Sequence, residues 1–526
     1  MTLEHEKITL DQKIGKETTQ ILLEGDIIVP DIKPDMAVVL QAEAKANISR
    51  TEVSADRINF IGKLDLHILY LARGSERPVH SMTATAPIDD FINMDGVAKD
   101  MWVDAEADVA NLDYKMVNDR KISYRCVVNV TVSAQSRCEH DIITNIGDLP
   151  ANQLQKSTLV LSRSIENKND RLMIKDELPI PSGKPNIREI LKTSVSISNK
   201  EARISNGRVN VTGELVVTTL YKADGDTSLI EFVEHEVPFN GAIDISRPTA
   251  DDMLVDVTLA VQDQYVQVKQ DDDGEDRVLD LEVALAAVVK VSCQDSIEIL
   301  EDAYCINKQL DISKTPVKYP RLVCRNRNQN TIKESVQIDD RAPDIMQIFR
   351  VTGKPIVDDV KIIDDKVIAE GVVEATALYL AESDELPLNS FTTVIPFRQA
   401  IETKGALSGA NDMEALLSAT VEHVGFNMLS GREMELRFLL AFNTQVLQEK
   451  SANMITDIVF SDMDKDRLAK SPSMIVYVVQ KGDSLWKIAK NYNTSIDDIL
   501  SVNDIDDPNK IYPGQKLLIL KKISEE

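Results

Sequence analysis

Apolar and polar residues alternate over several stretches of this chain. In the clearest stretch one face holds Ile58, Phe60, Leu64, Leu66, Ile68 and Tyr70, and the other holds Asn59, Lys63, Asp65 and His67. A period of two over this length predicts a half-buried antiparallel strand with its even-numbered face in a core. Ala55 and Asp56, directly before it, are turn residues and predict where the strand begins.

The same pattern occurs three times. Segments that begin at Lys33, Lys184 and Ala342 align without a gap, and landmark residues recur in register in all three. The landmarks are Pro34, Pro185 and Pro343; Gly62, Gly213 and Gly371; Tyr70, Tyr221 and Tyr379; and Pro87, Pro238 and Pro396. We interpret the chain as three homologous domains in tandem. The recurring glycine falls within the strand on its apolar side, which predicts a β-bulge or a close backbone approach.

Each copy also predicts a second pair of strands. The pairs cover residues 103–112 and 122–132, 254–268 and 278–291, and 416–428 and 433–446, each with a polar turn between its strands. Many strands with short turns and few helical periods indicate a mainly β protein, with three tandem β-rich domains of antiparallel sandwich or barrel type. We place these domains at residues 1–140, 141–295 and 296–450.

The pattern changes near the C-terminus. After a short strand around Val476, apolar residues follow at helical spacing, namely Leu485, Ile488, Ala489 and Tyr492. Thr494, with Asp497 three residues later, predicts the N-cap of a second helix, and residues 516–520 predict a closing strand. The result is a small β-α-α-β module at 474–522. The polar segment before it predicts a flexible linker at 451–473.

Composition narrows the functional classes. The formal net charge is −27, which argues against nucleic acid as the main partner because phosphate binding needs concentrated Lys and Arg. The N-terminal residues are charged and lack an apolar signal-peptide region, and the longest apolar run, 283–289, is too short to span a membrane. Five cysteines without a CxxC pair favour free thiols in a reducing cytosol. We therefore expect a cytoplasmic protein without a transmembrane segment.

The sequence holds no recognisable catalytic, cofactor or metal motif. Nucleotide-binding loops, the GxSxG elbow and HExxH are missing, and the six histidines lie at non-equivalent positions of the repeats. The acidic run 271–276 has two interpretations, a calcium loop or a solvated hairpin tip. The hairpin tip is favoured because Lys269 stands where an EF-hand would have its first ligand. We predict that the protein is not an enzyme and has no catalytic residues, cofactor or metal.

The C-terminal module resembles LysM domains. The resemblance rests on Tyr477, the run Gly482-Asp483-Ser484-Leu485-Trp486, Ile488, Ala489, Tyr492, Asn503 and the run Ile511-Tyr512-Pro513-Gly514-Gln515-Lys516-Leu517. LysM domains usually bind N-acetylglucosamine polymers such as peptidoglycan or chitin. The resemblance implies a partner- or glycan-binding groove formed by Gly482, Asp483, Ser484, Leu485, Trp486, Asn503, Ile511, Tyr512, Pro513 and Gly514.

Several of these residues have two interpretations. Trp486 is either a surface contact for a sugar or a protein, or part of the small core. Asp483 and Ser484 are helix-capping residues or ligand contacts. Gly482 and Gly514 are better explained by the backbone needs of turns than by contacts.

The repeats resemble the SPOCS domains of endospore-forming Firmicutes. They share the KPD, KPN or APD opening, the central glycine and the LY ending, and a LysM module follows them. The resemblance implies a spore morphogenetic protein of the mother-cell cytoplasm, recruited to the forespore surface and the spore coat. It also implies a protein partner, the morphogenetic ATPase that polymerises in the coat basement layer, and a LysM module that acts in protein–protein contact.

Three functions compete on these grounds. The leading hypothesis is a non-enzymatic scaffold that tethers the ATPase to the forespore through LysM, with weak sites on several domains adding through effective concentration. The alternative is a peptidoglycan-binding protein of the cell wall or spore cortex. An enzyme carried by a LysM targeting module is the least supported, because no polar constellation recurs in the three copies.

Overall fold

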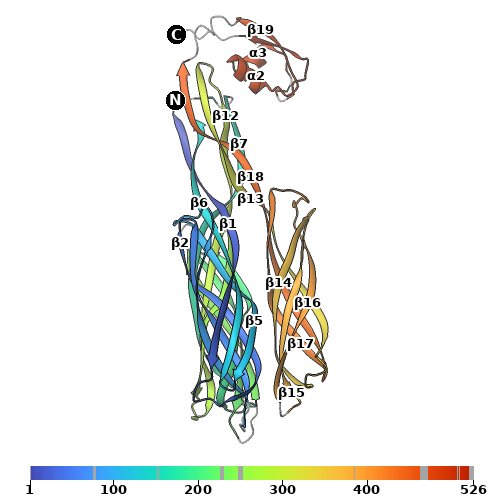
Figure 1. The fold of residues 1–526 in the computed structure, drawn as a ribbon. Coiled ribbons are helices and arrows are strands. Elements are labelled where there is room, and N and C mark those ends of the chain that lie inside the picture. The colour runs from blue at the N-terminus through green and yellow to red at the C-terminus, as the bar shows by residue number, and fades with distance from the viewer. Residues whose placement is uncertain are drawn as a thin grey trace.

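Strands make up almost all of this fold. The computed structural model describes residues 2–74, 79–147, 149–150, 153–225, 230–246, 253–383, 386–462, 472–505, 507–508 and 510–520. Figure 1 shows a broad β-rich body, a narrow stalk that rises from it, and a small domain with two helices at the far end of the stalk. The predicted mainly β class, with three repeats and a β-α-α-β module, is confirmed.

Each repeat has the same order of six strands. The first repeat contains β1 (Leu3–Ile28), β2 (Met36–Ser54), β3 (Arg57–Ala72), β4 (Val79–Asn93), β5 (Trp102–Asn118) and β6 (Lys121–Ile146). The second contains β7 (Leu154–Pro179), β8 (Ile187–Ser205), β9 (Arg208–Ala223), β10 (Ile230–Asp244), β11 (Leu254–Gln270) and β12 (Asp276–Ala303). The third contains β13 (Lys308–Gln337), β14 (Ile345–Ile363), β15 (Lys366–Ala381), β16 (Leu388–Glu402), β17 (Met413–Ser430) and β18 (Glu433–Asp462).

Two three-stranded antiparallel sheets pack together in each repeat. In the first repeat they have the orders β2-β3-β4 and β1-β6-β5. The predicted even-numbered face of β3 is buried, and Phe60 and Leu64 share a core with Val128 and Val130 of β6. The predicted parity is therefore correct, and the domains are sandwiches whose inner faces exclude water.

The recurring glycine lies where two backbones approach closely. A Cβ added at Gly62 would be 2.2 Å from the carbonyl oxygen of Asn47, and one at Gly371 would be 2.1 Å from that of Ile356. In both repeats the neighbouring strand, β2 or β14, shifts register at this point. The predicted bulge with close backbone approach is confirmed, and its physical reason is that any side chain would collide with main chain.

The recurring tyrosine and proline are joined by one hydrogen bond. The hydroxyls of Tyr70, Tyr221 and Tyr379 donate to the carbonyl oxygens of Pro34, Pro185 and Pro343 at 3.1, 3.1 and 3.2 Å. All three tyrosines are fully buried. Each bond thus ties the loop before the second strand of a repeat to the end of its third strand, which explains why the two landmarks recur together.

An arginine that was not among the predicted landmarks recurs at the same end of each repeat. Arg120 donates to Asp35 at 2.7 Å, Arg277 to the side-chain oxygen of Asn186 at 2.7 Å, and Arg432 to Asp344 at 2.6 Å. Each guanidinium also donates to a backbone carbonyl of the loop that follows the first strand. The arginine lies just before the sixth strand or at its start, and it fastens this end of the strand to that loop.

The stalk is built from the first and last strands of the repeats. β1 pairs with β6 from Leu3 opposite Ile146 to Ile28 opposite Lys121, whereas β5 pairs only with the lower part of β6. β7 with β12 and β13 with β18 form two further antiparallel pairs of this kind. Their upper parts share a core: Ile8, Leu10, Ile142, Leu159, Leu161, Ile297, Ile299, Val317, Tyr319 and Met454. This apolar core thus holds the three strand pairs, which are distant from one another in sequence, together in one stalk.

A second shared core joins the three sandwiches around a common axis. Equivalent leucines, Leu69, Leu220 and Leu378, are buried together with Leu191 and Phe349. Phe232 meets Phe349 edge to face at 5.0 Å. Equivalent lysines of the first and third repeats make equivalent contacts with the next repeat: Lys45 donates to Val261 O at 2.7 Å and Lys354 to Val109 O at 3.2 Å. The repeats therefore close a pseudo-threefold ring.

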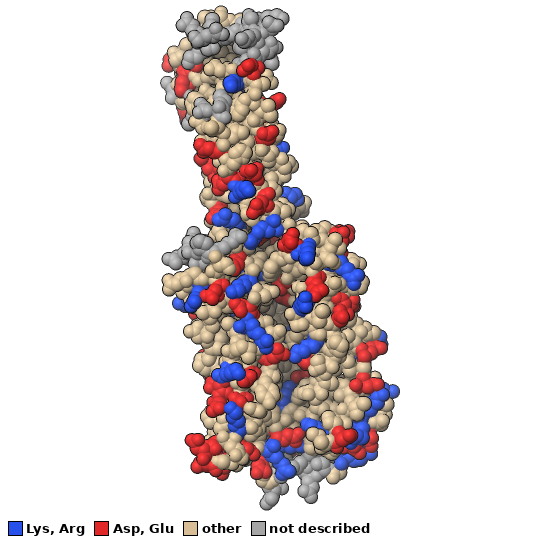
Figure 2. Space-filling view, turned by 90° about the vertical axis from the view of Figure 1, so that its left-hand side faces the viewer, with Lys and Arg blue, Asp and Glu red and all other residues tan. Residues whose placement is uncertain are grey.

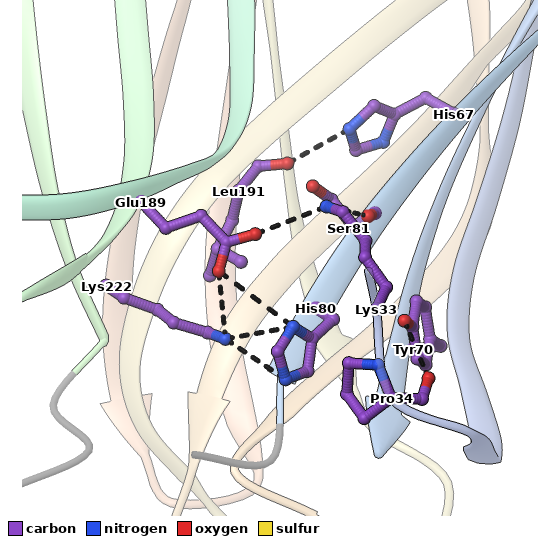
Figure 3. Close-up of polar contacts among 9 residues, drawn as sticks. All are labelled: Lys33, Pro34, His67, Tyr70, His80, Ser81, Glu189, Leu191 and Lys222. Carbon is purple, nitrogen blue, oxygen red and sulfur yellow. Dashed lines mark hydrogen bonds and ion pairs between the residues drawn. The ribbon is translucent and has the colours of Figure 1, made fainter. Parts of the chain in front are cut away.

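Partly buried charges lie between the first two repeats (Figure 3). Glu189 pairs with Lys222 at 3.1 Å and with Lys33 at 3.2 Å, and the ring of His80 lies 3.2 Å from Lys222. Burial alone would raise the pKa of Glu189, but the two lysines outweigh it and hold that pKa below its usual value. The cluster pairs its charges within the protein and acts as a polar joint between repeats.

The second histidine in Figure 3 is neutral near pH 7. His67 Nε2 lies 3.0 Å from the carbonyl oxygen of Leu191. Burial, and after it the charge of Lys192, lowers the pKa of His67 to about 4. The neutral ring donates this hydrogen bond across the interface between the first two repeats.

The strands run past the predicted domain borders. β6 ends at Ile146, β12 at Ala303 and β18 at Asp462, because each final strand pairs with its repeat's first strand up to the tip of the stalk. Residues 451–462 are therefore strand and not part of the predicted linker 451–473. Residues 463–471 of that linker lie outside the described residues. All five cysteines are unpaired, as predicted.

Candidate functional site

The C-terminal module packs two helices on a two-stranded sheet. Strand β19 (Met474–Val478) pairs antiparallel with β20 (Lys516–Leu520), and α2 (Leu485–Tyr492) and α3 (Ile496–Val502) lie between them in sequence. The core holds Val479, Leu485, Ile488, Ala489, Ile499, Leu517 and Ile519. No described helix has the length and apolar character needed to cross a membrane.

The cap of α3 differs from the predicted one. Ser495, and not Thr494, is the N-cap, and it forms a capping box with Asp498. The Ser495 hydroxyl accepts from Asp498 N at 3.0 Å, and the backbone N–H of Ser495 donates to Asp498 Oδ2 at 3.4 Å. Thr494 is only 1% exposed. Both residue types cap well, so the choice between neighbours depends on which side chain the core takes up.

The turn before α2 fixes two of the nominated groove residues. Asp483 Oδ2 accepts from the Tyr477 hydroxyl at 2.6 Å and from Gln480 N at 2.8 Å. The bond to Asp483 raises the pKa of Tyr477 to about 12, and the same bond lowers the pKa of Asp483. Ser484 is the N-cap of α2 and accepts from Lys487 N at 3.2 Å. Both residues therefore shape the turn, whatever ligand they contact.

Asn503 joins α3 to the closing strand. Its amide donates to the carbonyl oxygens of Ile499 and Leu518, and its own carbonyl accepts from Leu518 N, all at 2.7 Å. This uses both amide hydrogens and a carbonyl lone pair inside the domain. Asn503 thus holds the opposite wall of the nominated groove in place.

Two neighbouring turns form an exposed surface, which we call the rim: Gly482, Ser484, Tyr512, Pro513 and Gly514. Gly514 N donates to Val479 O at 2.9 Å and brings the turns together. Gly482 and Gly514 have φ of +92° and +90°, with no atom within 4 Å of an added Cβ, so their backbone conformation favours glycine. Tyr512 is 66% exposed, and the preceding residue, Ile511, is half-buried.

The remaining two nominated residues face inward. Leu485 is 3% exposed in the core. Trp486 is half-buried and meets Tyr304, from the segment after β12, edge to face at 5.3 Å between ring centroids. Lys490 on α2 pairs with Asp302 of β12. Sequence reasoning could not find Asp302 and Tyr304 as neighbours of the module, because they belong to another domain and repeat in no motif.

Other candidate sites do not develop into reaction centres. The acidic run 271–276 is a turn in which Asp271 Oδ1 accepts from the backbone N–H of Asp273 and Glu275, both at 3.0 Å. Among the described residues, no group of three or more His, Cys, Asp or Glu side chains is placed to hold a metal. On the face that Figure 2 shows, Lys and Arg side chains are interspersed with Asp and Glu and form no continuous basic surface.

Comparison with known proteins assigns the domains. The model of the SipL SPOCS domain matches residues 35–117, 186–269 and 344–429, and the LysM model matches 477–520. A curated Bacillus subtilis protein named SpoIVD-associated factor A is 40% identical over 47 residues, 9% of this chain and 12% of that protein. The spore coat assembly protein ExsA of Bacillus cereus is 42% identical over 50 residues, 9% of this chain and 8% of that protein.

These relatives match over a small part of their length, and no solved structure matches. Each SPOCS match begins one residue before the second strand of a repeat and ends one residue before the end of its fifth strand. The matches therefore coincide with the repeat found from sequence. The chain is thus a SPOCS-domain protein with three such domains and a C-terminal LysM domain.

Proposed function

We propose that this protein is a non-enzymatic scaffold of spore-coat assembly. It tethers the morphogenetic ATPase of the coat basement layer to the forespore surface through its LysM domain, in the mother-cell cytoplasm. The observation that carries the proposal is the combination of three SPOCS domains with one LysM domain in a single chain. The names of two relatives, one a SpoIVD-associated factor and the other a spore coat assembly protein, support a role in the coat.

The arrangement of the domains supports a tether. The LysM domain lies at the end of the stalk, away from the broad body (Figure 1). Its rim is exposed, and Tyr512 offers an aromatic ring of the kind that anchors protein interfaces. The surfaces of the SPOCS sandwiches remain for a second contact at the forespore, so the stalk separates two binding regions.

The buried polar groups support a role without catalysis. Lys192 donates to Gln41 at 3.1 Å and pairs with Glu43 at 2.7 Å, and the cluster around Glu189 is paired in the same way. These are contacts between repeats, made where three sandwiches meet. They stabilise the ring and are not directed into a cleft that the described residues form.

Capture of the ATPase by the full chain tests the proposal. Tyr512→Ala should weaken capture by about tenfold, the scale of an aromatic interface anchor, whereas Tyr265→Ala should not. Tyr265 is a matched control because it is 58% exposed on a SPOCS domain. In cells, a fluorescent fusion should form a ring around the forespore. A fusion that stays diffuse in the mother cell, or capture that is absent in the parent, would contradict the proposal.

Peptidoglycan is the second candidate ligand. The match to the LysM model favours it, together with a rim that has two glycine turns and an exposed tyrosine. Purified sacculi should then sediment the full chain, and Tyr512→Ala should reduce sedimentation while Tyr265→Ala does not. Sedimentation with sacculi together with no capture of the ATPase would favour the glycan-binding function over the scaffold.

A further inference from the structure

The segment after β12 reaches into the LysM domain. Tyr304 is 4% exposed and belongs to the same buried cluster as Leu485, Ile488 and Ile499, with Ile306 packed against it. Burial, and after it the carboxylates of Asp497 and Asp498, raises the pKa of Tyr304 to about 12. A residue from the segment between β12 and β13 is therefore part of the LysM core.

An ion pair adds to this contact. Lys490 Nζ lies 2.7 and 2.6 Å from the two carboxylate oxygens of Asp302. The same ammonium lies 5.2 Å from the centre of the Trp486 ring. Asp302 and Tyr304 thus cover one surface of α2, which we call the Trp486 face and define as Trp486 and Lys490. The carboxylate meets the ammonium, and the phenol ring meets the indole.

The contact leaves two polar atoms unsatisfied. Within the described residues, neither Trp486 Nε1 nor the Tyr304 hydroxyl has a hydrogen-bond partner, although both atoms are buried. Burying a donor without an acceptor costs free energy, and this cost disappears when the contact opens and water binds the donor. The ion pair is partly exposed, with 36% and 22% of the two side chains accessible, so salt screens it. The covered state is therefore weaker than the cores on either side of it.

We propose that the Trp486 face is a second interaction surface of the LysM domain, kept covered by the chain's own Asp302 and Tyr304. The external partner it fits is a protein segment with a carboxylate and an aromatic ring at the same spacing. Such a segment competes with Asp302 and Tyr304 and takes their place when these two residues leave the Trp486 face. This deepens the proposed function and rests on it, since it assigns a partner contact to the same domain.

Fluorescence quenching of Trp486 in the full chain measures how far Asp302 and Tyr304 shield the Trp486 face from solvent. The chain has 2 tryptophans, so Trp102→Phe leaves Trp486 as the only one. In that background Asp302→Asn and Tyr304→Ala should raise the acrylamide quenching constant about twofold or more, as a half-buried indole becomes solvated. Lys318→Gln, which removes the exposed stalk pair with Glu449, should leave it unchanged. Equal quenching in all variants would overturn the proposal.

Hydrogen exchange provides a second test that does not depend on the Trp102→Phe substitution. In chains that keep both tryptophans, amides of α2 should exchange several-fold faster in Asp302→Asn and Tyr304→Ala than in the parent. A synthetic peptide with this chain's residues 298–308, added to the double variant, should slow that exchange again. The same peptide with both positions replaced should not. A peptide without effect would overturn the claim that the face recognises an acidic and aromatic segment.

Capture of the ATPase separates this inference from the proposed function. If the Trp486 face is uncovered in roughly a tenth of the parent molecules, the variants that uncover it should capture the ATPase about tenfold more tightly. Faster α2 exchange with unchanged capture would overturn the role of the face in binding and leave the proposed function intact. Suppose that neither the parent nor the Asp302→Asn and Tyr304→Ala variants capture the ATPase, although Asp302 and Tyr304 still cover α2 in the parent. That result would refute the proposed function and leave this inference intact.

Discussion

Gly62, Gly213 and Gly371 recur because of their neighbours and not because of a turn. In the first and third repeats the obstacle is a carbonyl oxygen of the adjacent strand, and in the second it is the ring of Phe239 at 2.8 Å. Main chain held in a sheet cannot move aside, whereas the end of a side chain can. The same kind of residue therefore has unequal importance at equivalent positions.

Substitution at Gly62 should reveal this restriction. Gly62→Ala places a methyl group against Asn47 O and should lower the free energy of unfolding by about 1–3 kcal/mol, the range of overpacked sites. Urea unfolding followed by circular dichroism measures the change. Gly183→Ala is the control, because nothing lies within 4 Å of its added Cβ. A loss at Gly183 as large as that at Gly62 would show that the collision is not the cause.

The buried His67 should make stability depend on pH. The unfolded residue takes up a proton near its usual pKa of about 6.5, but the folded one does so only near its pKa of about 4. The unfolded state therefore binds more protons between these values, and this contribution to stability is complete above pH 7 and is lost as pH falls from about 6.5 toward 4. The loss from this residue reaches about 3 kcal/mol at most.

His67→Gln tests this assignment. It removes the titrating ring and keeps an N–H donor for Leu191 O. The difference in unfolding free energy between pH 7 and pH 4.5 should be smaller in the variant than in the parent. Equal pH dependence in the two proteins would assign the acid sensitivity to other groups.

At the scale of elements, short-range rules located the turns and the strands correctly but not the far ends of the long strands. Asp56, Asn206 and Asp365 have positive φ at the predicted turns between the second and third strands, and each predicted alternating strand is present. The rules failed where two adjacent residues satisfied them equally. Thr494 and Ser495 both suit an N-cap, and burial of Thr494 in the LysM core decided between them.

Two substitutions distinguish these neighbours. Ser495→Ala removes the side-chain bond to Asp498 N and should weaken α3 by about 1 kcal/mol, the usual value of a lost cap. Thr494→Val should have little effect or a stabilising one, since the Thr494 hydroxyl has no hydrogen-bond partner among the described residues. Hydrogen exchange of α3 amides in the full chain measures both. A larger effect at Thr494 than at Ser495 would contradict the observed cap.

At the scale of the whole molecule, three sandwiches share two cores. One lies on the ring axis with Leu69, Leu220 and Leu378, and the other lies in the stalk with Ile8, Leu161 and Val317. Each repeat contributes apolar side chains to both, and burying such a side chain stabilises by about 1.5–3 kcal/mol. A single repeat therefore has a complete sandwich core but lacks partners for its axial and stalk surfaces.

A fragment with residues 2–147 should consequently self-associate. Removal of the other repeats exposes Ile8, Leu10, Leu69 and Val79, which are all buried in the full chain. Light scattering after size exclusion should detect oligomers that increase with concentration. The same fragment with Ile8→Thr and Leu69→Ser should be mainly monomeric. A monomeric unsubstituted fragment would contradict the importance of the shared cores.

The sequence by itself determined the repeat, the alternating strands and the LysM module, because period-two burial, turn residues and a dense local motif are properties of neighbouring residues. Only the tertiary structure decided that the outer strands extend into one stalk, that Asn503 is an internal brace, and that Trp486 faces Tyr304. The stalk and the contact of Trp486 with Tyr304 join segments far apart in the sequence, and Asn503 joins a helix to a strand within one domain. In each case the partner is set by the packing of elements against one another, which no local pattern encodes.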